Sequence, residues 1–208
     1  PVSYYLDSLK AIKESSNLKN LLAILLRIGN IVNGGTNRGG CYGFKLDFLE
    51  KVKDTKTREP GVSLTNFIAE SFPVDDLEKD LSVLKLAIST DIDTAKKTFN
   101  QIKGVITSLQ NVMPQAEKLL VDEGDTLKPK FNSFEQQNKK RLESNPKKFE
   151  EIDSKYKELV VSYGEEPEKM KINDFLSIFY NLSVDLKKAK IQNEDRKRKE
   201  KENAERKA

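Results

Sequence analysis

The sequence predicts an all-α protein, an elongated helical bundle with long coiled-coil-like helices. Apolar residues recur every three or four positions through long stretches, which is the spacing of one buried helix face. No stretch alternates apolar and polar residues between turn signals, as a half-buried strand would. Charged residues make up 34% of the 208 residues and apolar ones only 37%, which favours an extended surface over a compact globule.

The first clear helix signal covers residues 18–32. This stretch is apolar almost all round, and beyond its first turn Arg27 is the only charge. A helix with so few polar positions is expected to be buried on most sides. Asn30 and Asn33 lie three apart on one face of its last turn, where their amides can bond the loop that follows.

A glycine-rich loop follows this helix, with glycines at positions 34, 35, 39, 40 and 43. Glycine allows positive φ angles and close approach of the backbone, so such a loop adopts shapes that other residues would resist. Helix packing alone does not demand this composition, and function is therefore expected here. A second helix is expected from about Phe44 to Asp54, burying Leu46, Phe48, Leu49 and Val52.

Residues 63–70 then predict a short helix that ends at Phe72-Pro73. One long helix, capped by Asp75 or Asp76, is expected to carry a coiled-coil seam over residues 77–109, with one stutter near residues 88–92. At 1.5 Å per residue this seam would be roughly 50 Å long. Such a helix cannot fold alone and needs a partner helix.

Later segments supply the candidate partners. Residues 127–142 and 149–163 continue the helical apolar spacing, with a break between them at Asn145-Pro146. The final helix begins near Asn173 or Asp174 and is expected to bury Phe175, Leu176, Phe179, Leu182 and Leu186. Past Ala189 it is expected to project as solvated helix or to fray.

The chain is thus expected to contain three segments, a subdomain at 1–73 with the glycine-rich loop, a helical rod at 74–186 that packs back on it, and a charged helical tail at 187–208. The tail carries ten Lys or Arg and five Asp or Glu, so the basic excess is confined to it. Mixed-sign charge on a helix is typical of solvated surface. No aromatic residue follows Tyr180, so nucleic-acid binding is not expected.

Composition also excludes most catalytic chemistry. The chain has no histidine and a single cysteine, Cys41, so neither an enzyme nor a metal or other cofactor is expected. Gly35-Thr36 stands where a phosphate-binding loop requires a Lys-Ser/Thr pair, and a helix rather than a strand precedes it. There is no apolar stretch long enough to span a membrane and no signal-peptide pattern, so a soluble, cytoplasmic protein without membrane contact is expected. Pro1 suggests a fragment of a longer chain.

Residues 29–56 combine several fixed positions in a definite order. They are the helix end Gly29-Asn30-x-x-Asn33, the loop pair Arg38-Gly39, the run Gly43-Phe44-Lys45-Leu46 and the tripeptide Asp54-Thr55-Lys56. This pattern resembles the formin homology-2 domain, a family that nucleates actin filaments and processively caps their barbed ends. A weaker match, resembling the family's last helix, comprises Tyr163-Gly-Glu-Glu-Pro167, Phe175, Phe179, Lys188-Ala189 and Asn193.

The resemblance covers about the C-terminal half of such a domain and implies that the glycine-rich loop lies in the part called the post. In this family two chains form a head-to-tail ring, in which the lasso of each wraps the post of the other. The lasso has no counterpart here, so this chain is expected to be a monomer or to self-associate weakly. The resemblance implies actin and a second formin chain as partners and an actin-cytoskeletal location. It implies actin contacts at Lys56 and Lys45, and a lasso-receiving surface at Gly29, Asn30, Asn33, Gly34, Arg38, Gly39, Gly43 and Phe44.

An alternative function is a structural coiled-coil adaptor with no actin role, in which the seam over residues 77–109 recruits another helix. It would explain the long helices but leaves the glycines and asparagines of the loop without a purpose.

Overall fold

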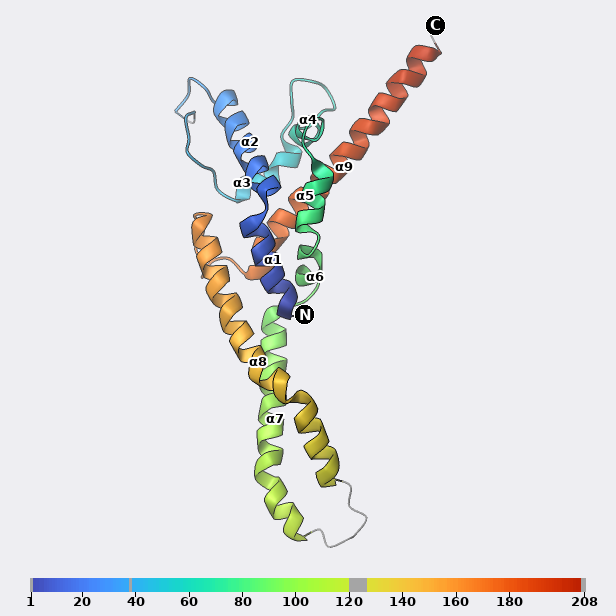
Figure 1. Ribbon diagram of the computed structural model, residues 1–208. Coiled ribbons are helices and arrows are strands. Elements are labelled where there is room, and N and C mark those ends of the chain that lie inside the picture. Colours follow the sequence, from blue (N-terminus) through green and yellow to red (C-terminus); the bar gives the residue numbers. More distant parts are fainter. Residues whose placement is uncertain (1, 38, 120–126, 207–208) are drawn as a thin grey trace. The chain divides into compact units, whose positions relative to one another are not determined.

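The computed structural model describes residues 2–37, 39–119 and 127–206, and Figure 1 shows their arrangement. These residues form helices, and the strand-like pairing among them is limited to an isolated bridge between Lys56 and Ser63. The all-α prediction is confirmed. The elements are α1 Val2–Glu14, α2 Ser16–Val32, α3 Asp47–Lys51, the 3-10 turn η1 Val52–Asp54, α4 Leu64–Ala69, α5 Val74–Leu81, α6 Leu84–Ile88, α7 Ile92–Leu119, α8 Leu127–Ser162 and α9 Ile172–Glu205.

The helices divide into two compact units. The first contains residues 3–89 and the chain from residue 155 onward, and the second contains residues 90–154. Helix α8 therefore contributes its C-terminal end to the first unit and its remainder to the second. The expected division into segments 1–73, 74–186 and 187–208 concerns function as well as packing, and it stays a prediction.

Helix α9 is the centre of the first unit, where α3, α4, α5 and α6 all pack against it. The Tyr163 ring, just past α8, packs edge-on against Phe175 and Phe179, with ring centroids 5.8 and 5.1 Å apart. Full burial of a Leu or Phe side chain stabilises a fold by about 1.5–3 kcal/mol. This helix is therefore a main source of hydrophobic stabilisation in the unit, and its predicted buried residues are confirmed at Phe175, Leu176, Phe179, Leu182 and Leu186.

A sharp break separates α1 from α2 at Ser15. The Ser15 hydroxyl accepts a hydrogen bond from the Leu18 N–H at 3.0 Å, which caps the start of α2. The same hydroxyl donates to Asp80 Oδ2 on α5 at 2.6 Å, and Asn17 Nδ2 donates to that oxygen at 3.0 Å. One carboxylate thus fixes the start of α2 to α5, while the other end of α2 leads into the glycine-rich loop (Figure 1).

The structure contradicts the prediction of one continuous helix over residues 77–109, because α5, α6 and α7 are three separate helices. At the first break, the Ser82 hydroxyl donates to the Lys79 carbonyl oxygen at 2.9 Å. At the second, the Asp91 carboxylate accepts from the Asp93 N–H at 3.1 Å. Side chains that bond the local main chain in this way compete with continuation of a helix. The stutter in the apolar spacing therefore marks a helix end.

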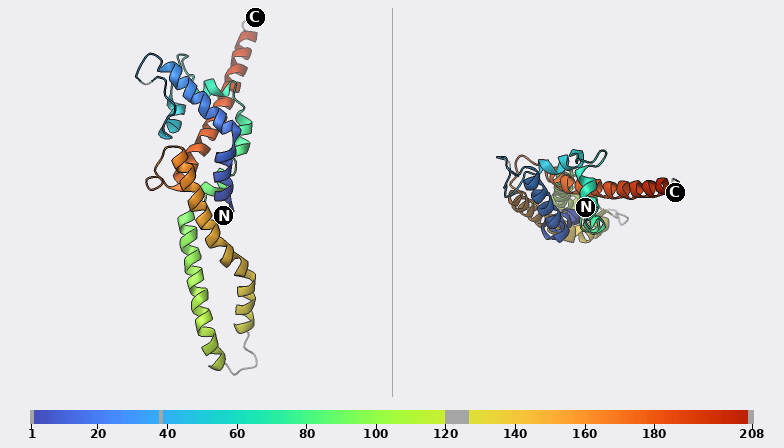
Figure 2. Two further views of the ribbon diagram at one scale, coloured as in Figure 1. Left: turned by 60° about the vertical axis from the view of Figure 1, so that its left-hand side comes forward. Right: turned by 90° about the horizontal axis from the view of Figure 1, so that it is seen from above.

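The second unit is an antiparallel pair of α7 and the first part of α8 (Figure 2). Phe99 packs edge-on against Phe149, with ring centroids 5.7 Å apart. Lys96 donates to both carboxylate oxygens of Asp153, at 2.7 and 2.8 Å. An aromatic contact and an ion pair thus join the two helices close to residues 90 and 154, where this unit begins and ends in the sequence.

The predicted helix break at Asn145-Pro146 is wrong, because α8 continues through Pro146. A proline inside a helix removes one main-chain hydrogen bond and bends the helix without necessarily ending it. Figure 1 shows α8 bent along its length. In a helix of 36 residues the remaining hydrogen bonds and the contacts with α7 maintain the helical conformation on both sides of the proline.

One flank of α7 remains open within the second unit. Ile102, Val105, Leu109 and Val112 are between 43% and 60% exposed, whereas Ile106 is buried. The predicted seam counted Ile102 and Leu109 among its buried positions. The second unit thus covers only part of that seam.

Helix α9 continues through the charged tail as far as Glu205 (Figure 1). Every residue from 197 to 206 is exposed, so the prediction of a solvated helical projection is confirmed for this part. Asn193 is buried, however, and its Nδ2 donates to the Asn66 carbonyl oxygen on α4 at 2.7 Å. The first part of the tail therefore belongs to the packed structure.

Candidate functional site

Helix α2 buries only one of its faces. Leu18, Leu21 and Leu25 are buried, but Ile31 is 73% and Val32 is 76% exposed. The prediction that this helix is buried on most sides is therefore wrong. Apolar periodicity identified the helix, but it could not show that its second face is left uncovered by the described residues. A large apolar surface of this kind is typical of a binding site.

Asn30 holds the glycine-rich loop through two hydrogen bonds. Its Nδ2 donates to the carbonyl oxygen of Cys41, and its Oδ1 accepts from the N–H of Cys41, both at 2.8 Å. The amide thereby satisfies a donor and an acceptor of a loop that has no strand partner. The predicted bond from Asn30 to the loop backbone is confirmed.

The prediction that the Asn33 amide also bonds the loop is not confirmed among the described contacts, in which Asn33 acts through its main chain. Its N–H donates to the Gly29 carbonyl oxygen at 3.0 Å, and its own carbonyl oxygen accepts from the N–H and the hydroxyl of Thr36, at 3.1 and 2.7 Å. The loop returns so closely to this turn that a Cβ at Gly39 would lie 2.7 Å from the Asn33 carbonyl oxygen. A side chain at position 39 would therefore force the backbone to move.

The other glycines of the predicted surface differ in how much room a side chain would have. A Cβ at Gly34 would lie 3.2 Å from the Ile31 carbonyl oxygen, which is a tight contact. A Cβ at Gly29 or Gly43 would meet nothing within 4 Å. Packing among the described residues therefore does not explain these two glycines. Arg38, also predicted for this surface, lies outside the described residues.

The run after the loop positions an aromatic pair. Phe44 packs edge-on against Phe48 with ring centroids 5.2 Å apart, and Leu46 is buried. Glu165 Oε1 accepts from the Leu46 N–H at 3.3 Å, at the start of α3. The helix begins at Asp47, later than the predicted Phe44. The two sequence matches, around 43–46 and 163–167, thus meet in space.

Two shallow grooves flank the open face of α2. Both are lined in part by Ala23 and Leu26, which form the ridge between them. The first, of about 560 Å³, is further lined by Leu22, Gly43, Phe44, Lys45, Leu46, Ser162, Tyr163 and Gly164. The second, of about 720 Å³, is further lined by Ile24, Arg27, Asn30, Ile31 and Gly40. Three residues of the predicted lasso-receiving surface, Asn30, Gly43 and Phe44, thus line these adjoining grooves, together with Lys45, which is predicted to contact actin.

Lys56 lies in a hairpin-like loop over residues 55–63, here called the Lys56 hairpin. The Leu64 N–H donates to the Thr55 carbonyl oxygen at 2.7 Å, and the Thr57 N–H donates to the Val62 carbonyl oxygen at 3.0 Å. The Lys56 side chain is exposed beside a separate hollow of about 570 Å³. Lys45 and Lys56 thus face different hollows.

The sequence did not predict the polar contacts that hold the end of the Lys56 hairpin. Ser63 caps α4 by accepting from the Asn66 N–H at 3.3 Å, and the Asn66 Oδ1 accepts from the Ser63 N–H at 3.1 Å. Asn66 Nδ2 also donates to Asn193 Oδ1 on α9 at 3.2 Å. The spacing Ser63-x-x-Asn66 is a capping-box pattern, and it was the available signal.

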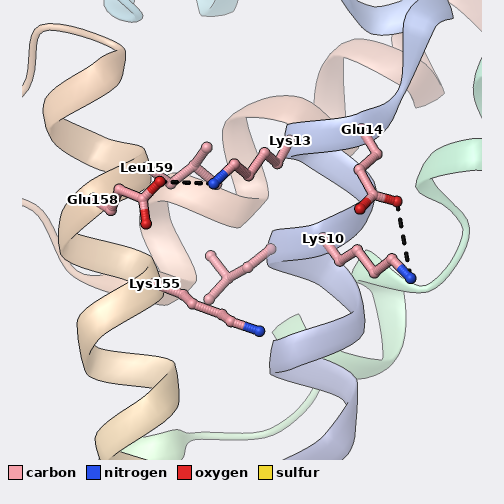
Figure 3. A pocket seen from close by; sticks show the side chains of 7 residues that line it. Lys10, Lys13, Glu14, Lys155, Glu158 and Leu159 are labelled. Carbon is pink, nitrogen blue, oxygen red and sulfur yellow. Dashed lines mark hydrogen bonds and ion pairs between the residues drawn. The ribbon is translucent and has the colours of Figure 1, made fainter.

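A further hollow, of about 370 Å³, lies between α1 and the end of α8 (Figure 3). Its walls carry opposite charges that pair with one another, Lys13 with Glu158 at 2.7 Å and Lys10 with Glu14 at 3.9 Å. The hydrogen bond from Lys13 lowers the pKa of Glu158. A carboxylate held ionised by a salt bridge is poorly suited to acid–base catalysis near neutral pH.

The pKa shifts elsewhere in the first unit also move groups away from neutrality. Burial raises the pKa of Tyr163 to about 12, and burial followed by the Asp174 charge raises that of Tyr156 to about 12. Among the described residues, no cluster of His, Cys, Asp or Glu could hold a metal ion. None of the helices in the described ranges combines the length and the hydropathy needed to cross a membrane.

These features define an all-α module built for binding, with a glycine-rich loop fixed by Asn30 beside an open apolar face. A family model of the Formin Homology 2 Domain matches residues 6–187. The chain belongs to the Formin Homology 2 domain family.

Similar proteins include named formins and related proteins. Formin-A of Dictyostelium discoideum is 28% identical over 195 residues, covering 88% of this chain and 15% of that protein. Disheveled-associated activator of morphogenesis 1-A of Xenopus laevis is 30% identical over 198 residues, covering 90% of this chain and 18% of that protein. Protein diaphanous homolog 3 of Homo sapiens is 28% identical over 194 residues, covering 88% and 16%. The chain therefore spans less than a fifth of the length of each of these relatives.

Proposed function

We propose that this chain is the actin-binding, post-bearing part of a formin that nucleates actin filaments and processively caps their barbed ends. Family membership supports this proposal, together with the resemblance of residues 29–56 to the family's motif. The work is binding without covalent chemistry, because actin's own association energy drives filament growth. It requires no cofactor, and its place is the actin cytoskeleton of the cytoplasm.

The open face of α2, beside the loop that Asn30 holds, supports this proposal most directly. The two grooves on this face share the Ala23 and Leu26 ridge, and both are apolar in character. A site that receives an extended segment needs such a preformed groove, because a preorganised surface lowers the entropy cost of binding. The lasso of a second formin chain is the occupant that the family resemblance implies.

The exposed lysines support a second contact, with actin. Lys56 projects from a hairpin whose backbone is fixed by hydrogen bonds, and Lys45 stands at the rim of the first groove. A lysine on a rigid loop can reach an acidic surface while its stem remains in contact with the protein. In this arrangement the grooves hold two formin chains together and the lysines face the filament.

A test separates the groove from the rest of the fold. In a dimeric formin domain containing this chain, Ala23→Trp would place a large side chain on the ridge and obstruct both grooves without entering the core. The variant should lose dimerisation in analytical ultracentrifugation and lose barbed-end capping in elongation assays, with unchanged helix content. Lys19→Trp, at an exposed position of the same helix, is the matched control. Retained dimerisation and capping in Ala23→Trp would refute the proposed role of this face.

The open flank of α7 favours a second candidate function, a structural coiled-coil adaptor. Ile102, Val105, Leu109 and Val112 follow a 3-4-3 spacing and are exposed within the second unit. A helix that docked there would cover a seam typical of coiled coils. Val105→Glu should abolish any such association. The adaptor function replaces the actin proposal if two results are found together. Val105→Glu abolishes association with another helix, and the wild-type dimeric domain does not bind actin filament ends.

A further inference from the structure

We propose that Arg196 on α9 is a positioning residue for the Lys56 hairpin, where it holds Glu59 so that this carboxylate does not pair with Lys56. The actin-facing role of Lys56 rests on the proposed function. The contact made by Arg196 does not, and it can be tested in the absence of actin.

Hydrogen bonds within the Lys56 hairpin fix its base and also the main chain of Glu59 at its tip. The Glu59 N–H donates to Thr57 Oγ1 at 3.2 Å, and the Glu59 carbonyl oxygen accepts from the Val62 N–H at 3.2 Å, which leaves only the Glu59 side chain to be held by other contacts. The base is closed by the bond from Leu64 to Thr55 and by two bonds from Thr57 to the Val62 carbonyl oxygen, at 2.7, 3.0 and 2.9 Å. Val62 is buried, which anchors the returning arm. The tip carries Glu59, whose side chain is 68% exposed.

Arg196 contacts this tip from another element. One guanidinium nitrogen lies 3.8 Å from Glu59 Oε1, and a second donates to Glu70 Oε1 at 3.1 Å. The Arg196 side chain is only 29% exposed, so its fork is held between the two carboxylates. Asn193, one turn earlier on α9, fixes the helix to α4 and so brings the guanidinium to this position.

Glu59 is also one of two acidic residues, with Asp54, that line the hollow beside Lys56 and can compete for its ammonium. Glu59 and Lys56 are three apart in one hairpin and both line the hollow of about 570 Å³. Among the described ion pairs Glu59 is held by Arg196, and none involves Lys56. Without Arg196 the Glu59 carboxylate would be a local partner for the Lys56 ammonium. An acidic surface would then have to displace that partner before it could bind Lys56.

Arg196 lies beyond the residues that the family model matches, whereas Glu59 lies within them. The family model ends at residue 187, whereas Arg196 follows on the helical extension of α9. This extension of α9 thereby controls which charged side chains of the Lys56 hairpin pair with one another, although the hairpin is distant in sequence. Arg196 touches neither the proposed partner nor a reacting group, so its effect on binding passes through Glu59.

Amine reactivity tests the contact in this chain alone. Competitive acetylation followed by mass spectrometry reports how readily each lysine reacts, with Lys130 as an internal reference. In Arg196→Gln the reactivity of Lys56 should fall about twofold, the effect of one exposed ion pair. The double variant Arg196→Gln/Glu59→Gln should restore it, because the competing carboxylate is gone.

Two controls isolate Glu59 as the cause. Glu70→Gln removes the other partner of Arg196, and Arg198→Gln removes a nearby arginine that pairs with Asp195 at 2.8 Å. Both should leave Lys56 reactivity at the wild-type level. An unchanged Lys56 in Arg196→Gln, or a loss of reactivity that Glu59→Gln fails to reverse, would overturn the inference. Thermal unfolding curves that match wild type ensure that every variant is folded.

Barbed-end binding by a dimeric domain supplies the functional readout. Arg196→Gln should weaken end binding about two- to fivefold, within the range of an exposed ion pair, and Arg196→Gln/Glu59→Gln should recover it. Arg196→Lys should retain most of the binding, because the positive charge remains. If acetylation changes as expected while Lys56→Asp has no effect on end binding, the proposed actin contact fails and the positioning role stands. If Lys56→Asp weakens end binding but acetylation is unchanged, the positioning role fails alone.

Discussion

The Asn193 side chain donates a hydrogen bond to the Asn66 main-chain carbonyl oxygen at 2.7 Å, and the Asn66 amide donates back to Asn193 Oδ1 at 3.2 Å. Both residues are buried, and they join α9 to α4. Buried amides are stabilising when paired and costly when one partner is lost. This pair therefore makes the first part of the charged tail a structural element of the first unit.

Asn193→Ala should lower the free energy of unfolding by about 1–3 kcal/mol, because it leaves the buried Asn66 carbonyl oxygen without the Asn193 donor, while the Asn66 amide keeps its bonds to Ala189 and Gln192. Urea unfolding followed by circular dichroism measures this change. Asn203→Ala is the matched control, since it makes the same substitution at an exposed position of the same helix. It should change stability by no more than about 0.5 kcal/mol. Equal effects of the two variants would show that the pair does not stabilise the fold.

Asp75 on α5 links stability to pH. Hydrogen bonds from Lys187, at 2.7 Å, and then from Lys190 lower its pKa to about 2. The pKa of an unfolded Asp is about 3.9, so the ionised carboxylate stabilises the fold above about pH 4. This contribution should be lost as the pH falls from about 4 to about 2.

Asp75→Asn should therefore reduce stability at pH 7 and flatten its dependence on pH between about 4 and 2. Urea midpoints at a series of pH values measure both effects. Asp76→Asn is the control, because Asp76 pairs only locally with Lys79, at 3.3 Å. If the Asp75 variant loses stability in acid in parallel with wild type, Asp75 is not the group responsible.

The glycines of the loop region should separate into two classes. Gly29 lies in α2 with open space around it, so Gly29→Ala should raise the unfolding free energy by about 0.5–1 kcal/mol. Gly39→Ala should instead destabilise the chain by about 1 kcal/mol or more, because its Cβ would meet the Asn33 carbonyl oxygen. Urea unfolding of both variants provides the measurement.

The Gly29 variant also tests the proposed partner surface. A stabilised Gly29→Ala chain that binds the lasso of a second formin chain more weakly, in a titration with that segment, would place the lasso close to Gly29. Wild-type affinity would remove Gly29 from the proposed surface.

Local chemistry made much of this fold predictable. The fixation of the loop by Asn30 and the apolar core positions of α9 followed from residue types and helical spacing. The breaks between α5, α6 and α7 did not, because the apolar spacing runs almost unchanged through serines and an aspartate that end the helices. The continuation of α8 through Pro146 was also missed. Here the sequence carries a helix-breaking residue, but a helix that is long enough tolerates one missing hydrogen bond.

The site was less predictable than the helices. Phe44 and Tyr163 are far apart in sequence, and only the tertiary structure brings them to one groove. The exposure of Ile31 and Val32 likewise could not be predicted, because it depends on which face of α2 the other helices cover. The contact of Arg196 with Glu59 joins two charged residues that composition alone assigns to solvated surface.

The isolated chain should be a folded monomer or a weak self-associator that does not nucleate filaments. The family resemblance implies that residues 1–208 contain no lasso, and holding two actin subunits in register needs two linked binding sites whose second contact gains from effective concentration. Light scattering at micromolar concentration should give the monomer mass, and pyrene-actin assembly curves should be unchanged. A stable dimer would instead implicate the open flank of α7. Clear acceleration of assembly by a monomer would refute the need for two linked sites.

Lys56 is proposed to contact actin when this chain is part of a dimeric formin domain. Lys56→Asp replaces an attractive contact by a repulsive one, so each chain should lose on the order of 2–4 kcal/mol of end binding if the contact is desolvated. Folding should hardly change, because an exposed substitution is usually within about 0.5 kcal/mol. The matched control is Lys130→Asp, at an exposed position outside the family motif.

The direct measurement is barbed-end elongation by single filaments in the presence of each variant of the dimeric domain. Lys56→Asp should lose its hold on growing ends while Lys130→Asp behaves as wild type, with both melting curves intact. If both variants alter elongation to the same degree, or neither does while both remain folded, Lys56 is an ordinary solvated lysine and the proposed actin contact is wrong.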